Sequence, residues 1–96
     1  MHAVVRRYTG VSRLMDEMTQ RQEEVENIIK QVPGFQAYYA VRDGDALTTV
    51  TVCEDEAGTE ASTGAAAQWV QENLPDLTAS APAVDDGNVI LTFSRN

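Results

Sequence analysis

The fold of this chain is decided by residues 35–53, which read Phe-Gln-Ala-Tyr-Tyr-Ala-Val-Arg-Asp-Gly-Asp-Ala-Leu-Thr-Thr-Val-Thr-Val-Cys. Aromatic and β-branched side chains dominate both halves of the stretch, so it predicts two strands, over residues 35–42 and 47–53. Asp43-Gly44-Asp45 lies between them and is typical of a tight turn, because Asp-Gly tolerates positive φ angles. We therefore expect an antiparallel hairpin at the centre of the chain.

A long helix is predicted before the hairpin, over residues 11–32. Its apolar residues recur at spacings of three and four, which places them on one stripe: Val11, Leu14, Met15, Met18, Val25, Ile28, Ile29 and Val32. Ser12 is a candidate N-cap, and Pro33-Gly34 ends the helix. Arg21 and Gln22 interrupt the stripe. They form either a solvent-facing notch, the preferred interpretation, or a pair that reaches a pocket or a dimer seam.

A second helix is predicted between the acidic residues 54–56 and Pro75, with Asp55 or Thr59 as its cap. Its stripe is rich in small residues until a tryptophan supplies bulk: Ala61, Ala65, Ala66, Trp69, Val70, Asn73 and Leu74. Two further strands are expected at the ends of the chain, over residues 2–9 and 89–95. Residues 75–88 are interpreted as a surface connection, with a short extended piece near residues 79–84 and a turn at residues 85–88.

The resulting order, β-α-β-β-α-β, predicts an α+β protein of ferredoxin-like fold, a single domain over residues 1–96. Right-handed crossovers would place both helices on one face of a four-stranded antiparallel sheet. The strands are nevertheless apolar on both sides, with Val4 and Tyr8 opposite Ala3 and Val5. A sheet with one face in water has a more polar outer side. We therefore expect a second copy of the chain to cover the free face, as a homodimer.

Composition excludes several classes of function. The 96 residues carry 7 basic and 15 acidic side chains, a net charge of -8, so neither nucleic acid nor a membrane surface is an expected partner. Cys53 and His2 are the only cysteine and histidine, which predicts no disulfide, no metal site and no cofactor. The N-terminus has no apolar run typical of a secretory signal, and no stretch is long enough to cross a membrane. A cytoplasmic protein is the expectation.

Two segments resemble proteins of the antibiotic-biosynthesis-monooxygenase superfamily. One is Val50-Thr-Val-Cys-Glu-Asp-Glu-Ala-Gly58, with Ser62 and the run from Ala66 to Leu74. The other is Pro33-Gly34-Phe35, followed by Tyr38-Tyr39. The resemblance implies a dimeric α/β barrel whose two sheets face each other, with a pocket in each subunit between sheet and helices. Members include cofactor-independent oxygenases of aromatic polyketides and haem-degrading enzymes.

The resemblance also implies a pocket position for Trp69, since a tryptophan on the second helix often lines the pocket of these enzymes. Core packing of Trp69 is the simpler interpretation. The haem-degrading members use a histidine near the end of that helix, and residues 72–77 contain none, so haem is not expected. His2, at a chain end where fraying is common, is expected to have no role.

Arginine, tyrosine and glutamine side chains are further candidates for the pocket. Arg6 and Arg7 are adjacent in a strand, so one of them points inward, either to a carboxylate or to an anionic ligand; the sequence does not decide which. The phenols of Tyr8, Tyr38 and Tyr39 can donate hydrogen bonds to a ligand. With Arg6, Gln22 and Trp69 they complete the candidate pocket. Cys53 is expected to be an inert core residue and the acidic run a helix cap.

Two functions remain open. The first is a dimeric α/β-barrel protein that binds a small apolar or aromatic molecule between sheet and helices, which the lack of an acid–base or metal constellation favours. The alternative is a cofactor-independent monooxygenase acting on an aromatic or phenolic substrate, which rests on the resemblance and on Trp69. Fold-level analogy is a weak argument for activity, so the binding function is preferred.

Overall fold

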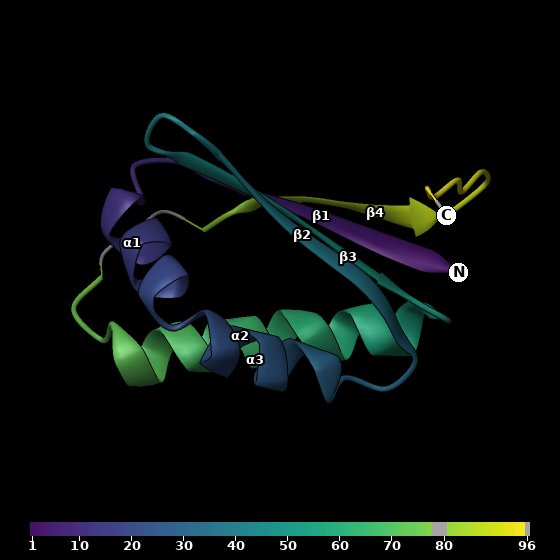
Figure 1. Ribbon diagram of the computed structural model, residues 1–96, viewed down its shortest axis with the longest axis horizontal. Helices are drawn as coiled ribbons and strands as arrows, with labels where there is room; N and C mark the ends of the chain where they lie inside the picture. Colours follow the sequence, from purple (N-terminus) through teal and green to yellow (C-terminus); the bar gives the residue numbers. More distant parts are fainter. Residues whose placement is uncertain (78–80, 96) are drawn as a thin grey trace.

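A four-stranded antiparallel sheet lies over three helices in the computed structural model, which describes residues 1–77 and 81–95 (Figure 1). Along the chain the elements are β1 (His2–Tyr8), α1 (Ser12–Gln20), α2 (Gln22–Lys30), β2 (Phe35–Asp43), β3 (Ala46–Cys53), α3 (Glu56–Asn73) and β4 (Ala83–Asn88). The strands lie in the order β2-β3-β1-β4, and each neighbouring pair is antiparallel. The predicted α+β class and ferredoxin-like arrangement are confirmed.

The central hairpin forms as predicted, with β2 and β3 joined at Gly44 and Asp45. Asp43 pairs with Ala46 across the turn. Gly44 has a φ of 63°, in the left-handed region that a glycine enters without steric cost. The strand propensity of the residues and the turn-forming Asp-Gly pair favour the same structure, which explains why the sequence predicts this hairpin correctly.

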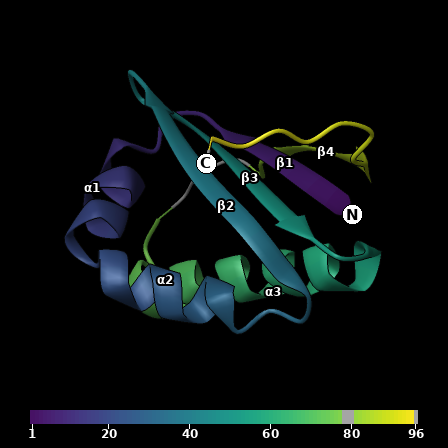
Figure 2. The same ribbon diagram turned by 45° about the vertical axis from the view of Figure 1, so that its right-hand side comes forward.

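The predicted single helix over residues 11–32 is wrong, because it is divided into α1 and α2 at Arg21. The backbone of Arg21 lies outside the helical region, at φ −115° and ψ 39°. Its guanidinium pairs with Glu17, at 3.2 Å, and donates to the amide oxygen of Asn73 on α3. The break lets α1 and α2 take different directions against the sheet (Figure 2). Ser12 is the first residue of α1 and caps nothing, since Val11 holds the N-cap position.

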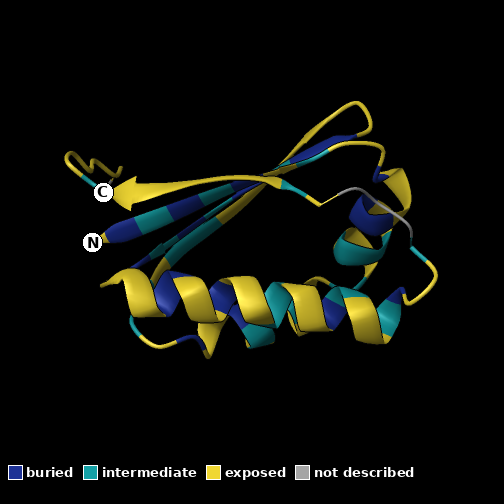
Figure 3. Cartoon of the chain, turned by 180° about the vertical axis from the view of Figure 1, so that it is seen from behind, coloured by how far each residue is buried: buried dark blue, intermediate teal, exposed yellow. Residues whose placement is uncertain are grey.

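The last helix, α3, begins after Asp55, whose carboxylate accepts a hydrogen bond from the amide of Gly58 at 3.2 Å. Its fully buried residues are mostly small, namely Gly58, Thr59 and Ser62, with Trp69 two turns further on. Alanines 65 and 66 are half-buried, whereas Ala61 of the predicted stripe is exposed (Figure 3). The small residues allow α3 to approach the strands closely, and Trp69 fills the wider space beyond them.

The final strand is not where the alternation of residues 89–95 placed it. β4 spans Ala83–Asn88, which includes the expected turn at residues 85–88, and it pairs with β1 from Arg7↔Ala83 to His2↔Asn88. The amide of Val89 donates to the carbonyl of Met1, the residue that precedes β1. Residues 89–95 therefore have no further strand beside them, and Phe93 is 89% exposed. Of the expected extended piece near residues 79–84, residues 79 and 80 lie outside the described residues.

The two faces of the sheet differ in what covers them. Alternate residues of the central strands, including Val4, Arg6, Leu47 and Thr49, are buried beneath the helices. The opposite face carries mainly apolar side chains that no helix covers: Ala3, Val5, Ala37, Tyr39, Val41, Val50 and Val52. Tyr39 is 63% exposed on it. We call this surface the outer face.

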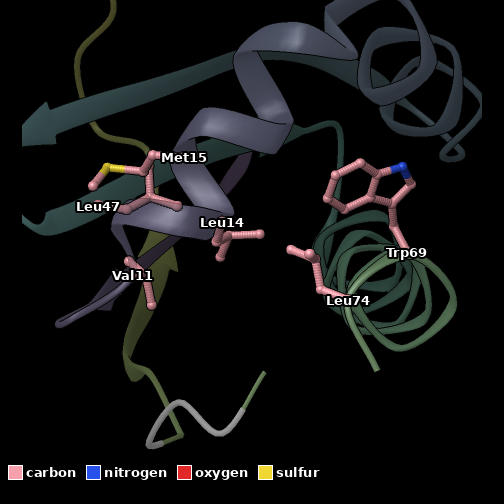
Figure 4. Close-up of a cluster of buried hydrophobic side chains, with 6 residues drawn as sticks. All are labelled: Val11, Leu14, Met15, Leu47, Trp69 and Leu74. Carbon is pink, nitrogen blue, oxygen red and sulfur yellow. The ribbon is translucent and has the colours of Figure 1, made fainter. Parts of the chain in front are cut away.

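The core on the helix side is a cluster of Val11, Leu14, Met15, Leu47, Trp69 and Leu74 (Figure 4). Its residues come from α1, β3 and α3 or from the caps of these helices, so the cluster joins α1 and α3 to the sheet. None of the described helices combines the length and the apolar character that crossing a membrane would need.

Candidate functional site

A cavity of about 40 Å³ lies between the inner face of the sheet and the helices. Alternation along the strands directs Arg6 and Tyr8 of β1, Tyr38 of β2, and Leu47 and Thr49 of β3 toward it. The helices close the other side with Leu14, Met18, Val25, Ile28, Ile29, Ala66, Trp69 and Val70. Arg6 is the only charged residue in this lining. The cavity is thus an apolar space with a single cation on its wall.

Arg6, not Arg7, is the inward-facing arginine. It is 2% exposed, while Arg7 is exposed on the other side of β1. Its guanidinium donates to three threonine hydroxyls: Nε to Thr49 at 3.4 Å, NH1 to Thr63 at 2.7 Å, and NH2 to Thr51 at 3.1 Å. Thr49 and Thr51 project from the same side of β3, and Thr63 comes from α3 above them. The hydroxyls hold the guanidinium in one orientation without neutralising its charge.

Tyr38 lies close enough to Arg6 for the two to interact electrostatically. Burial raises the pKa of the Tyr38 phenol above its ordinary value, while the nearby positive charge of Arg6 opposes that rise and Tyr8 adds to it. The phenol therefore stays protonated at neutral pH and is available as a hydrogen-bond donor. Tyr8 lines the same cavity from β1.

Trp69 belongs both to the core cluster and to the cavity wall, so the two interpretations of this residue are compatible. Its indole Nε1 donates to the Glu24 carboxylate at 3.0 Å, and its carbonyl accepts from Asn73. Glu24 is thereby turned toward the indole at the cavity's edge. The side chain is buried, with one polar atom satisfied, as a packed tryptophan requires.

A groove of about 430 Å³ adjoins the cavity between α1, α2 and β2. Four residues line both spaces: Met18, Val25, Ile29 and Tyr38. Gln22 lines the groove and not the cavity, together with Phe35, Ala40 and three polar or charged residues, Thr19, Glu26 and Lys30. Tyr39 lies away from both, on the outer face. The structure thus brings together Arg6, Tyr8, Tyr38 and Trp69, places Gln22 next to them, and separates Tyr39.

His2 is ordered and buried, in contrast to the expected frayed end. Its Nδ1 lies 2.8 Å from Thr59 Oγ1 and its Nε2 lies 3.7 Å from the Asp86 carboxylate. Across residues 1–77 and 81–95, no three side chains from His, Cys, Asp and Glu gather as a metal site. Burial raises the pKa of the Cys53 thiol, with a further contribution from Asp55, so little thiolate forms at neutral pH.

Haem does not fit the described site. The histidine of the chain is engaged by Thr59 and Asp86 and is not among the residues that line the cavity or the groove. The described residues that line the two spaces therefore offer no imidazole to the iron of a haem.

No family model and no curated protein matches the chain. Solved structures do. The protein NE2512 of unknown function from Nitrosomonas europaea aligns with a TM-score of 0.74 and 17% identity, over 99% of this chain and 94% of that one. The ActVA-Orf6 monooxygenase of Streptomyces coelicolor, solved with nanaomycin D, aligns with a TM-score of 0.68 and 17% identity, over 99% and 92%.

A haem-degrading protein from Mycobacterium tuberculosis, MhuD, also aligns, with a TM-score of 0.67 and 14% identity over 98% of this chain and 100% of that one. These similarities define a fold class: the chain has the fold of the antibiotic-biosynthesis-monooxygenase-like proteins. The resemblance seen in the sequence is confirmed at that level. Identities this low carry the fold and not the activity.

The sequence does not predict the partners of the site residues. Thr49 and Thr51 indicate only a strand, and Glu24 falls on the polar face of the predicted helix. One signal was present: two threonines at spacing i and i+2 on a strand next to an arginine-bearing strand share one face. What the sequence lacked was the register, which sets Arg6 directly opposite Thr49.

Proposed function

We propose that this protein binds a small apolar or aromatic molecule between the sheet and the helices, and that it works as a homodimer. The observation that carries the binding function is the cavity beside Trp69 and Tyr38, together with the groove of about 430 Å³ that shares four residues with it. Mostly apolar walls with a few oriented polar groups are typical of small-molecule sites. The residues described around the cavity and the groove include no histidine and no cysteine.

Binding can be tested with the fluorescence of Trp69, the only tryptophan of the chain. Small aromatics that bind in the groove and reach the adjoining cavity are expected to change its emission in a saturable way. Ala40→Phe, which adds a ring on the groove wall, should weaken binding by about tenfold or more, whereas Ala67→Phe on the exposed side of α3 should not. A flat titration across a panel of mono- and bicyclic aromatics would contradict the proposal. Oxygen uptake with hydroxylated anthrones, above a protein-free blank, would instead support the monooxygenase alternative.

Two apolar surfaces support the homodimer. One is the outer face of the sheet. The other is the C-terminal segment, where Ile90, Leu91 and Phe93 are 88%, 72% and 89% exposed. Apolar surface of this extent usually marks an interaction site. A protein of the same fold from an uncultured marine organism is a dimeric ferredoxin-like protein.

Native mass spectrometry at micromolar concentration is expected to show twice the mass of the chain. Tyr39→Lys should convert it to a monomer that still folds, because Tyr39 lies on the outer face and is largely exposed within one chain. A buried lysine without a partner would be costly in the interface. Gln71→Lys on the exposed side of α3 is the matched control and should remain dimeric. A monomeric mass for the unmodified protein would refute the dimer.

A further inference from the structure

Arg6 is a buried cation with no counter-charge among the residues that the structure describes. The ion pairs among the described residues use His2, Arg13, Arg21, Lys30 and Arg42, and none includes Arg6. Three neutral hydroxyls are its described partners. A guanidinium has five N–H bonds, so these contacts leave one on each terminal nitrogen. Burying an unpaired charge is costly, and proteins keep such groups paired or at sites that meet a charged ligand.

The surroundings of Arg6 favour an anion. No carboxylate is among the described residues that line the cavity, and Glu24 is bonded to the indole of Trp69. The positive charge acts on Tyr38 through the buried interior, since it lowers the pKa of that phenol against the effect of burial. Electrostatic attraction is stronger in such a low-dielectric space than in water. Tyr38 and Arg6 together offer hydrogen-bond donors to the same small volume.

The two volumes set the shape of the ligand. A cavity of about 40 Å³ accepts a few atoms, whereas a dry cavity of roughly 150 Å³ is needed for a benzene ring. The groove beyond Met18 and Tyr38 is large enough for an apolar body. The two spaces therefore fit a ligand whose small head lies in the cavity and whose larger body lies in the groove, on either side of Met18 and Tyr38. Of the common anionic heads, a carboxylate is small, planar and matched to two N–H donors of a guanidinium.

We infer that the site binds an apolar or aromatic monocarboxylic acid, with the carboxylate at Arg6 in the cavity and the apolar body in the groove. This inference rests on the proposed binding function and names its ligand class. Thr49, Thr51 and Thr63 act as positioning residues, because they fix the guanidinium while leaving donors free. Arg6 is then the residue that selects an acid over a neutral compound of the same shape.

The test compares acids with their isosteric amides on the 96-residue chain. Phenylacetate, 4-phenylbutyrate and 2-naphthylacetate, each beside its primary amide, are titrated by Trp69 fluorescence and by calorimetry at pH 7.5. Each acid is expected to bind at least about tenfold more tightly than its amide. Arg6→Met, which keeps the length and removes the charge, should abolish that preference. Arg13→Met, at an exposed position of α1 that lines neither the cavity nor the groove, should retain it.

Each outcome is decisive. If the amides bind as tightly as the acids, the inference is overturned while the binding function stands. If the acid preference survives in Arg6→Met, the anion is held elsewhere and the inference is also overturned. If neither acids, amides nor neutral aromatics bind, the proposed function fails with it. Should Arg6→Met not fold, Arg6→Lys keeps the charge without the planar fork, and must weaken acid binding more than amide binding.

Discussion

Replacing Trp69 with alanine is expected to lower the free energy of unfolding by about 3–5 kcal/mol. The side chain is 5% exposed and packs in the cluster with Leu14 and Leu74. Removal of the indole would enlarge the cavity that already lies beside it. It would also leave the Glu24 carboxylate without its hydrogen-bond donor. Urea unfolding at 25 °C, followed by circular dichroism at 222 nm, measures the change, since the variant has no tryptophan to report by fluorescence.

Trp69→Phe is the matched control for this prediction. It keeps an aromatic ring in the cluster and removes the hydrogen bond to Glu24, so its cost should be roughly half that of the alanine variant or less. A loss below about 1 kcal/mol for Trp69→Ala would show that the indole is not packed as described. Comparable losses for the two variants would mean that the hydrogen bond to Glu24, rather than packing, carries the stability.

Gly58→Ala is expected to destabilise the protein by about 2–3 kcal/mol, although alanine is the better helix former. A Cβ on Gly58 would lie 2.4 Å from the Pro33 carbonyl oxygen and 2.7 Å from Cys53 Cβ. The oxygen belongs to the backbone and cannot rotate away, so α3 would have to move off the sheet. The midpoint and slope of the same urea titration separate a loss of stability from a change in the unfolded state.

Gly64→Ala, six residues further along α3, isolates the steric effect. Nothing lies within 4 Å of a Cβ at that position, so the substitution should stabilise the protein by about 0.5–1 kcal/mol. The prediction therefore concerns the sign of the change in the free energy of unfolding as well as its size. The same substitution at two positions of α3 should lower it at Gly58 and raise it at Gly64. If both variants gain stability, the close approach of α3 to Pro33 and Cys53 is incorrect.

The sequence predicts best where one local signal decides the structure. The hairpin of β2 and β3 has strand-forming residues on both sides of an Asp-Gly turn, and every part of it is found. The break at Arg21 is different, because the apolar stripe continues on either side of it. Its cause is tertiary: the guanidinium bonds to Asn73 on α3, more than fifty residues away. The gap in the stripe at Arg21 and Gln22 marked the position without revealing that the helix ends there.

The last strand was misplaced for a related reason. Val89, Leu91 and Phe93 alternate as a strand does, while Asp85-Asp86-Gly87 is typical of a turn. β4 nevertheless pairs with β1 over residues 83–88, where Asn88 faces His2, the first residue of β1. At the edge of a sheet, backbone hydrogen bonds to the neighbouring strand are enough to hold a segment as a strand, even where its residues have poor strand propensity. An alternating pattern cannot reveal where its partner strand stops.

The candidate site was foreseen as a set of residue types and not as an arrangement. Arg6, Tyr8, Tyr38 and Trp69 were named, and the structure gathers them around one cavity. Tyr39 is a candidate only because it is a phenol, and it lies on the outer face of the sheet. β1 is apolar on both faces, so its pattern carried no information on whether Arg6 or Arg7 is buried. That choice depends on the register with β3, a long-range property.

The composition of β4 also determines the form that association can take. As an edge strand, it presents unpaired backbone groups to which another strand could add without limit. Asp85 and Asp86 are both exposed there, and a strand arriving from a second molecule would bring its own copies of these carboxylates. Growth into fibres through this edge is thus opposed by charge. In the proposed homodimer, contact through the outer face would instead be isologous: it would close after two chains and leave no further template.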